Sequence, residues 1–140
     1  MLAQETYRSY ANARFSYSIE YPPDLLVPQG ESDNGDGQKF LSHDGHAELL
    51  VYGSNNALHR SLKSIYESEI STADHPGRVV TYKVLRADWF VISGREAGKI
   101  FYLKTYLKDG VFKTMRFEYD EAAKQTYDPV TVKIARSFRG

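Results

Sequence analysis

Four strand-like segments follow one another between residues 79 and 119, and this stretch constrains the fold more than any other. Its strongest signal is Asp109-Gly110, because Asp-Gly between two β-rich segments is typical of a tight hairpin turn. A weaker turn at Ala87-Asp88 and another near Ala97-Gly98 divide the remainder into strands of similar length. The stretch therefore predicts four consecutive antiparallel strands, on which the rest of the chain packs.

Two turn models compete at the Asp109-Gly110 hairpin, and they place the strand residues on different faces. A two-residue turn pairs Lys108 with Val111, whereas a three-residue loop with a bulge pairs Leu107 with Val111. A slip of one residue moves every side chain of a strand to the opposite face, so the separation of apolar from polar residues should decide the register. The three-residue loop separates them more cleanly and is therefore predicted. One face then carries Tyr102, Lys104, Tyr106, Phe112, Thr114, Arg116 and Glu118.

Helices are expected on either side of this stretch. The two earlier strands, 79–86 and 89–93, have apolar residues on both faces, which predicts a sheet covered on both sides. Apolar residues at helical spacing predict an amphipathic helix that is capped by Asn55 or Asn56 and runs to about Thr72.

A second helix is predicted at the C-terminal end of the chain. Asp128 is expected to be its N-cap and Pro129 its first residue. Proline has no backbone N–H, but the N–H of the first helical residue has no partner within the helix, so proline is tolerated there. Tyr127, just before the cap, is expected to pack against Val132. This helix would face the sheet.

The N-terminal part of the chain adds further strands. Residues 15–21 alternate between apolar and polar, which predicts a half-buried strand ended by Pro22-Pro23. Residues 38–43 and 46–52 are expected to form a hairpin about Asp44-Gly45. Residues 1–12 are expected to be a poorly ordered lead-in or, from residue 5, a short edge strand.

Together these elements predict one α+β domain over residues 1–140. It is a single-domain α/β/α sandwich, with a central antiparallel sheet of about six to seven strands and two main helices. One domain is also the usual organisation of a chain of 140 residues.

Composition narrows the function classes. The 18 basic residues balance the 18 acidic ones, so no global field attracts nucleic acid or an anionic membrane, and no nucleic-acid partner is expected. The absence of cysteine excludes disulfides and thiol chemistry. No apolar run approaches the roughly 18–20 residues that a membrane span needs. The first five residues lack the basic region and apolar core of a signal peptide.

Several landmarks together resemble a known fold. They are the 15–22 strand ending in Tyr21-Pro22, the hairpin Asp36-Gly37, Phe40 and Asp44-Gly45, the helix after Gly53-Ser54-Asn55-Asn56, the meander with Trp89, Ser93-Gly94 and Ile100-Phe101-Tyr102, and the closing Ser137-Phe138. From about Tyr7 to Phe138 the chain resembles the α/β/α sandwich of PsbP-like and Mog-type proteins, and within it small exported bacterial proteins of unknown function. The resemblance implies an accessory or protein-binding role without catalysis, a protein partner, and a periplasmic or secreted location. It carries over no functional residue.

Two candidate metal sites can be tested against the structure. His43, His46 and Glu48 are expected on one face of a hairpin, where two imidazoles and a carboxylate could hold zinc in a metal-binding protein or a metal-dependent hydrolase. Residues 32–37 resemble part of a calcium loop, but His43 stands where the bidentate glutamate belongs, which favours an ordinary turn-rich loop.

No enzyme signature accompanies these residues. The sequence has no Gly-x-Ser-x-Gly elbow, phosphate loop, dinucleotide fingerprint or HExxH motif, so catalytic residues are not assigned and no cofactor is expected.

A mixed aromatic and basic sheet face is the remaining candidate. It comprises Tyr102, Lys104, Tyr106, Phe112 and Arg116. Aromatic residues and arginine are the residues that most often anchor protein interfaces, so this face is the predicted binding surface. The competing interpretation is structural, with a helix covering the face.

Overall fold

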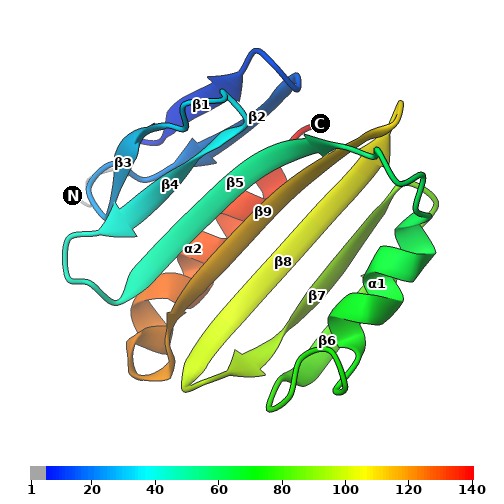
Figure 1. Cartoon of the computed structure of the whole chain (residues 1–140). Coiled ribbons are helices and arrows are strands. Elements are labelled where there is room, and N and C mark those ends of the chain that lie inside the picture. Colours follow the sequence, from blue (N-terminus) through cyan, green and yellow to red (C-terminus); the bar gives the residue numbers. More distant parts are fainter. Residues whose placement is uncertain (1–5) are drawn as a thin grey trace.

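A seven-stranded antiparallel sheet forms the centre of the computed structural model, which describes residues 6–140 (Figure 1). In chain order its strands are β3 (Leu26–Glu31), β4 (Gly37–Ser42), β5 (Ala47–Asn55), β6 (Val79–Leu85), β7 (Trp89–Glu96), β8 (Lys99–Lys108) and β9 (Val111–Asp120). Their spatial order is β3-β4-β5-β9-β8-β7-β6. The predicted four-strand meander is confirmed, and its last strand, β9, joins the earlier hairpin by pairing with β5.

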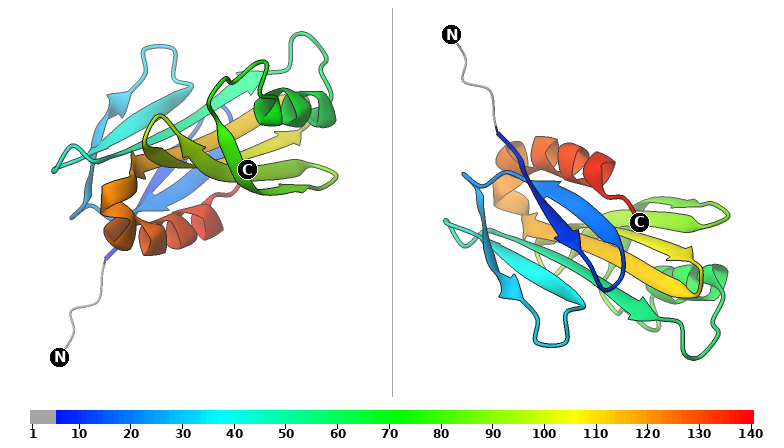
Figure 2. Two further views of the ribbon diagram at one scale, coloured as in Figure 1. Left: turned by 90° about the horizontal axis from the view of Figure 1, so that it is seen from below. Right: turned by 90° about the horizontal axis from the view of Figure 1, so that it is seen from above.

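The helices cover opposite faces of this sheet (Figure 2). Helix α1 (Leu62–Ile70) packs against β6 and β7, whereas α2 (Lys124–Ser137) packs against β8, β9 and β2. A 3-10 turn, η1 (Glu121–Ala123), leads into α2. The α+β sandwich with two main helices is therefore confirmed. Within residues 6–140, neither helix has the length and apolar character that crossing a membrane requires.

A separate hairpin accompanies α2 on its face. Strand β1 (Arg8–Asn12) pairs with β2 (Tyr17–Tyr21), and a bridge between Ser18 and Arg139 ties β2 to the C-terminal end. Of the two predictions for the N-terminal segment, the short strand is therefore the one observed from Arg8 onward. Residues 1–5 of the predicted lead-in lie outside the described residues.

The hydrophobic core has two parts, one on each side of the sheet. On the α2 side the largest fully buried side chains include Phe40, Phe117 and Ile134. On the α1 side a smaller cluster is formed by Leu62, Phe90, Ile92, Phe101 and Leu103. Helix α1 lies over β6 and β7 on one face and α2 over β8 and β9 on the other, so the α2 side of β6 and β7 and the α1 side of β4 and β5 have no helix packed on them (Figures 1 and 2).

The predicted register of the β8–β9 hairpin is wrong. Lys108 pairs with Val111, so the turn has two residues, and Asp109 and Gly110 both take positive φ (53° and 75°). This turn matches the twist of the two strands. The prediction assumed that the apolar residues of β8 lie on one face, but β8 buries residues on both faces. Phe101 and Leu103 face α1, whereas Tyr102 faces α2.

Both helices begin at residues other than those predicted. The N-cap of α1 is Ser61, whose Oγ accepts a hydrogen bond from the Ser64 N–H at 3.1 Å. Asn56 instead closes a loop by accepting from the Arg60 N–H at 2.9 Å. Helix α2 starts at Lys124, which places Pro129 inside the helix.

Candidate binding surface

An aromatic and basic surface lies on the β6–β8 half of the sheet, beside α2 and on the same face. Trp89 of β7 pairs with Tyr106 of β8. Ser93 of β7 pairs with Tyr102 of β8 on one side and with Tyr82 of β6 on the other, so all these side chains lie on one face. We define the open face as Tyr82, Trp89, Tyr102, Lys104 and Tyr106. Residues directly opposite each other on antiparallel strands project to the same side, so the register alone assembles this set.

Lys104 lies over the aromatic rings of this face. Its Nζ is 5.2 Å from the centre of the Trp89 ring and 5.0 Å from that of Tyr106. The rings attract the ammonium group electrostatically, and they hold it beside apolar surface. Tyr106 is fixed in turn, because its hydroxyl donates to the Phe138 carbonyl at 3.2 Å. The open face is therefore ordered by its own contacts.

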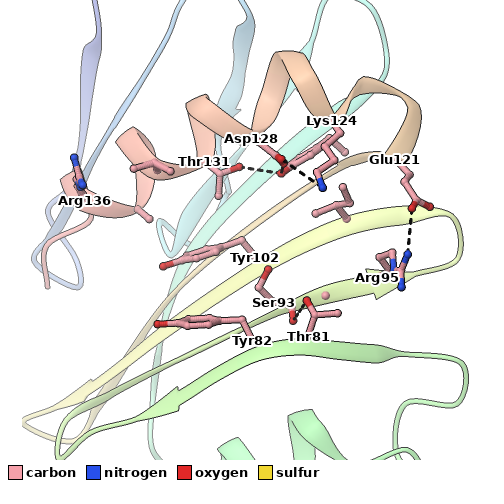
Figure 3. A pocket seen from close by; sticks show the side chains of 15 residues that line it. Thr81, Tyr82, Ser93, Arg95, Tyr102, Glu121, Lys124, Asp128, Thr131 and Arg136 are labelled. Atoms are coloured by element: carbon pink, nitrogen blue, oxygen red, sulfur yellow. Dashed lines mark hydrogen bonds and ion pairs between the residues drawn. The ribbon is translucent and has the colours of Figure 1, made fainter.

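A groove with a volume of about 680 Å³ runs between the open face and α2 (Figure 3). The rings of Tyr82 and Tyr102 lie side by side on its sheet wall, and Val132 contributes an apolar side chain from α2. Tyr82 is 56% exposed and Val132 is 49% exposed. The groove therefore presents apolar surface to solvent at a place where large side chains gather.

Basic groups surround this groove. Arg95 pairs with Glu121 at 3.4 Å and Lys124 approaches Asp128 at 4.0 Å, while Arg136 is exposed near the C-terminal end of α2 (Figure 3). Both pairs are at the surface, where an ion pair contributes little and is readily exchanged for another partner. These cations are therefore available to an anionic partner.

Tyr102 is a neutral hydrogen-bonding group of the groove. Burial, with smaller contributions from Tyr82 and Tyr106, raises the pKa of Tyr102 to about 12. Its hydroxyl therefore stays protonated at neutral pH and can both donate and accept. The chemistry that the groove offers is stacking, hydrogen bonding by phenols, and attraction of negative charge.

The structure divides the predicted binding surface between the two faces of the sheet. Tyr102, Lys104 and Tyr106 lie together on the open face. Phe112 and Arg116 face the α1 side, so the expectation that all five residues share one face is wrong. The error follows directly from the register of the hairpin, since the two turn models place β8 and β9 differently relative to each other.

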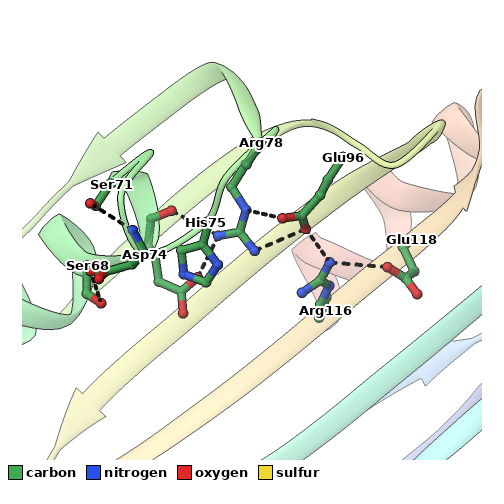
Figure 4. A network of polar contacts seen from close by, with 9 residues as sticks. Ser68, Ser71, Asp74, His75, Arg78, Glu96, Arg116 and Glu118 are labelled. Atoms are coloured by element: carbon green, nitrogen blue, oxygen red, sulfur yellow. Dashed lines mark hydrogen bonds and ion pairs between the residues drawn. The ribbon is translucent and has the colours of Figure 1, made fainter.

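Arg116 belongs to a charged network on the α1 side. Its guanidinium lies 3.2 Å from both Glu96 and Glu118, and it stacks 5.6 Å from the Phe101 ring (Figure 4). Phe112 lines a small cavity between the sheet and α1. Sequence reasoning missed Tyr82 and Trp89, whose positions near Tyr102 and Tyr106 follow from the β6–β7 and β7–β8 registers.

The predicted metal site is not formed. His46 turns toward β9, where its Nδ1 lies 2.6 Å from the Asp120 carboxylate, and Glu48 pairs with Lys39 at 3.3 Å. Within residues 6–140, no three His, Asp or Glu side chains are arranged to hold a metal ion, so His43, His46 and Glu48 do not form such a group. The β4–β5 register itself is as predicted, with Phe40 opposite Leu49. The side-chain partners of His46 and Glu48, and not the register, separate the group.

Side chains of the loop between β3 and β4 form hydrogen bonds within the loop. Ser32 Oγ donates to Asn34 Oδ1 at 3.0 Å and accepts from the Asp36 N–H at 3.2 Å. Gly35 takes a positive φ of 75° between them. These contacts support the interpretation of residues 32–37 as a turn-rich loop, in which Asp, Asn and Ser side chains set the backbone path.

Comparison with known proteins identifies the fold and nothing narrower. No protein-family model matches the sequence, and no curated protein matches it. The structure is similar to the solution structure of cyanobacterial PsbP (CyanoP) from Synechocystis sp. PCC 6803, with a TM-score of 0.68 and 13% identity. The similarity covers 99% of this chain and 94% of that chain, so the PsbP-like fold extends over the whole domain.

Proposed function

We propose that this chain with a PsbP-like fold is a non-catalytic accessory module that binds a protein partner through the open face. The observation that carries the proposal is the gathering of Tyr82, Trp89, Tyr102 and Tyr106 near Lys104, on the sheet surface that borders the groove beside α2. Tyrosine and tryptophan are enriched at interface centres because they bury a large area and keep a polar group.

The distribution of large apolar side chains supports this use of the surface. The opposite open half, over β4 and β5, carries the ion pair of Lys39 and Glu48 beside Leu41, Leu50 and Tyr52. Of these three apolar or aromatic side chains only Leu41 is exposed, at 38%, and the other two are half-buried. A sheet face that only needs to be solvated would be expected to resemble that half. The open face instead combines aromatic residues, a groove and cations, which together suit a partner that buries it.

A matched pair of double variants tests this proposal. The Tyr82→Ser/Lys104→Glu variant removes an exposed ring and reverses a charge on the open face. The Leu41→Ser/Lys39→Glu variant makes the corresponding changes on the opposite half of the sheet. Each protein is immobilised, incubated with extract of the source organism, and the retained proteins are identified and their affinity measured, after thermal melting has shown that both variants are folded.

The parent and the Leu41→Ser/Lys39→Glu control should retain the same protein. The open-face variant should bind it at least about tenfold more weakly, because truncating one hot-spot residue costs about 2 kcal/mol or more and about 1.4 kcal/mol is a factor of ten. Equal retention by both variants, or no specific protein on the parent, would refute the proposed function.

Export is part of the same proposal. It is supported by the resemblance to small exported PsbP-like proteins and is compatible with a chain that contains no cysteine. Fractionation of cells that express the natural gene should place the protein outside the cytoplasm. Recovery with the cytoplasmic enzymes would contradict export and leave the binding proposal to its own test.

A further inference from the structure

The two edges of the seven-stranded sheet differ in how they are protected. Edge strand β3 contains Pro28 and, at Gly30, a φ of 99°, and its last residue Glu31 accepts hydrogen bonds from Tyr10 (2.7 Å) and Asn12 (3.2 Å) of the neighbouring hairpin. Proline, irregular backbone and a covering segment are the usual means by which proteins prevent pairing at an edge. Strand β3 is therefore closed to a further strand.

The opposite edge strand, β6, has no proline, and its edge carries only a lysine, Lys83, and a register shift near the start of the strand. Its sequence Val-Val-Thr-Tyr-Lys-Val-Leu contains neither proline nor glycine, and four of its seven residues are exposed. β-Branched and aromatic residues of this kind favour extended structure. The one irregularity is a register shift between Val80 and Tyr82, which leaves four regular pairs with β7 from Tyr82 to Leu85.

The hydrogen bonds of β6 point alternately toward β7 and toward solvent. The Arg86 N–H donates to the Trp89 carbonyl at 2.9 Å, so by the alternation of an antiparallel pair Val84 and Tyr82 also face β7. Lys83 and Leu85 then direct their backbone groups outward. In the described part of the chain, neither makes a backbone hydrogen bond to another element, and the Leu85 carbonyl is met by the Arg86 guanidinium at 3.1 Å.

Positive charges outnumber negative ones beside this edge, where the β6–β7 turn contributes one carboxylate, Asp88. Residues 78–140 hold 13 of the 18 basic residues but only 7 of the 18 acidic ones, and β6, β7 and β8 belong to this segment. Lys83 and Arg86 lie on the edge itself, and Arg86 also stacks 6.0 Å from the Trp89 ring of the open face. On the α1 side, the nearby Glu69 is already bound by Arg78 at 2.7 Å.

We propose that β6 accepts an extended acidic segment of the protein partner as an eighth strand of the sheet. This inference rests on the proposed function and names the chemistry and the conformation of what is bound. The backbone of Lys83 and Leu85 would pair with the segment, and alternate side chains of the segment would pack beside Tyr82 on the open face. A second copy of this chain fits poorly, because it would bring two basic edges together.

Three synthetic peptides that differ only in charge provide the probe. Their alternating sequences are Thr-Glu-Val-Glu-Val-Glu-Thr, the same peptide with glutamine for glutamate, and the same with lysine for glutamate. Amide hydrogen exchange of the Lys83 and Leu85 N–H groups is measured by NMR on the full chain, with and without each peptide. Sedimentation of the free protein gives its oligomeric state under the same conditions.

The acidic peptide should slow exchange at Lys83 and Leu85 by about tenfold or more, the glutamine peptide should do so less, and the lysine peptide not at all. Absence of protection with all three peptides would overturn the inference. So would equal protection by the lysine peptide, or protection in the free protein together with a dimer, which would assign the edge to a second copy.

Two substitutions at one position separate backbone pairing from charge. Lys83→Pro removes an outward N–H while leaving the hydrogen bonds to β7, and should abolish protection at Leu85. Lys83→Thr keeps the N–H and removes the charge. It should weaken binding of the acidic peptide but leave the same amide groups protected when the peptide is bound. If a folded Lys83→Pro protein is protected like the parent, strand addition at β6 is excluded.

The failure of this inference can be told from the failure of the proposed function. If the Tyr82→Ser/Lys104→Glu protein loses its partner while the Lys83→Pro protein retains it, the open face binds without β6. If neither loses a partner that the parent retains, the proposed function itself fails.

Discussion

Asp44 and His46 show how individual polar residues acquire their roles from tertiary partners. Hydrogen bonds from the His46 N–H, the Ser42 hydroxyl and the Tyr127 hydroxyl lower the pKa of Asp44 to about 2. The Tyr127 hydroxyl lies 2.8 Å from the carboxylate, so this contact ties α2 to the β4–β5 hairpin. The neighbouring His46 side chain is oriented the other way, toward Asp120 of β9. Both carboxylates therefore serve the fold.

The pair formed by His46 and Asp120 gives a prediction about pH. The hydrogen bond to Asp120 raises the pKa of His46 above the ordinary value of 6.5. A raised folded-state pKa adds stability that is fully present below the unfolded-state value and is lost as pH rises through the folded-state value. The parent should therefore be more stable to unfolding than Asp120→Asn at low pH, and this difference in stability should shrink as pH rises above about 6.5.

NMR titration of the His46 ring and thermal melting at several pH values measure these effects. Asp109→Asn, which removes a carboxylate at a distant turn, is the control and should leave the His46 titration unchanged. An unchanged His46 titration in Asp120→Asn would contradict the assigned contact.

At the scale of elements, short local contacts decide where strands turn and where helices start. The β8–β9 turn depends on the positive φ of Asp109 and Gly110, and α1 depends on the hydroxyl of Ser61. A Cβ added at Gly110 would meet no atom within 4 Å. Any loss of stability caused by a side chain at residue 110 therefore comes from the backbone conformation and not from a steric clash.

Gly110→Ala should destabilise the protein by about 1–2 kcal/mol, because an L-residue is strained in the left-handed region. Urea unfolding measures the change in the free energy of unfolding. Lys108→Ala, at the adjacent exposed strand end, should change it by less than about 0.5 kcal/mol. A neutral Gly110→Ala would contradict the left-handed backbone conformation of Gly110 in this turn.

Ser61→Ala should cost about 1 kcal/mol through loss of the N-cap of α1. Ser61→Asp keeps an acceptor at that position and should stay close to the parent. The same unfolding experiment compares them. If both variants lose equal stability, the hydroxyl of Ser61 is not what caps the helix.

At the scale of the whole molecule, one sheet joins two cores and a charged network. Arg78 has a side chain only 3% exposed, contacts Glu69 at 2.7 Å and Glu96 at 3.2 Å, and Glu96 continues to Arg116 of β9 (Figure 4). Arg78 also stacks 4.8 Å from the Phe101 ring. The network therefore links the end of α1, the start of β6 and the middle of the sheet. Because the sheet is shared, neither face is expected to unfold by itself.

Phe101→Ala and Phe117→Ala test this cooperativity from opposite faces. Both side chains are almost fully buried, so each substitution should cost about 3–5 kcal/mol. Fluorescence of Trp89, which is the one tryptophan in the sequence, and far-UV circular dichroism should report a single transition for both variants. Leu58→Ala, at a side chain that is 82% exposed, should be close to neutral. Separate transitions for the two probes would show that the faces unfold independently.

The sequence by itself determined the order of elements, the Asp109-Gly110 turn and the antiparallel sandwich, because turns and strand periodicity are encoded within a few neighbouring residues. It also indicated that Tyr102, Lys104 and Tyr106 share a face. Only the tertiary structure decided the β8–β9 register, and with it the separation of Phe112 and Arg116 from that face. The reason is that both sides of this sheet are partly buried, so apolar residues on alternate positions do not identify a single inner face. The partner of His46 was likewise decided by the pairing of β9 with β5, which no local pattern records.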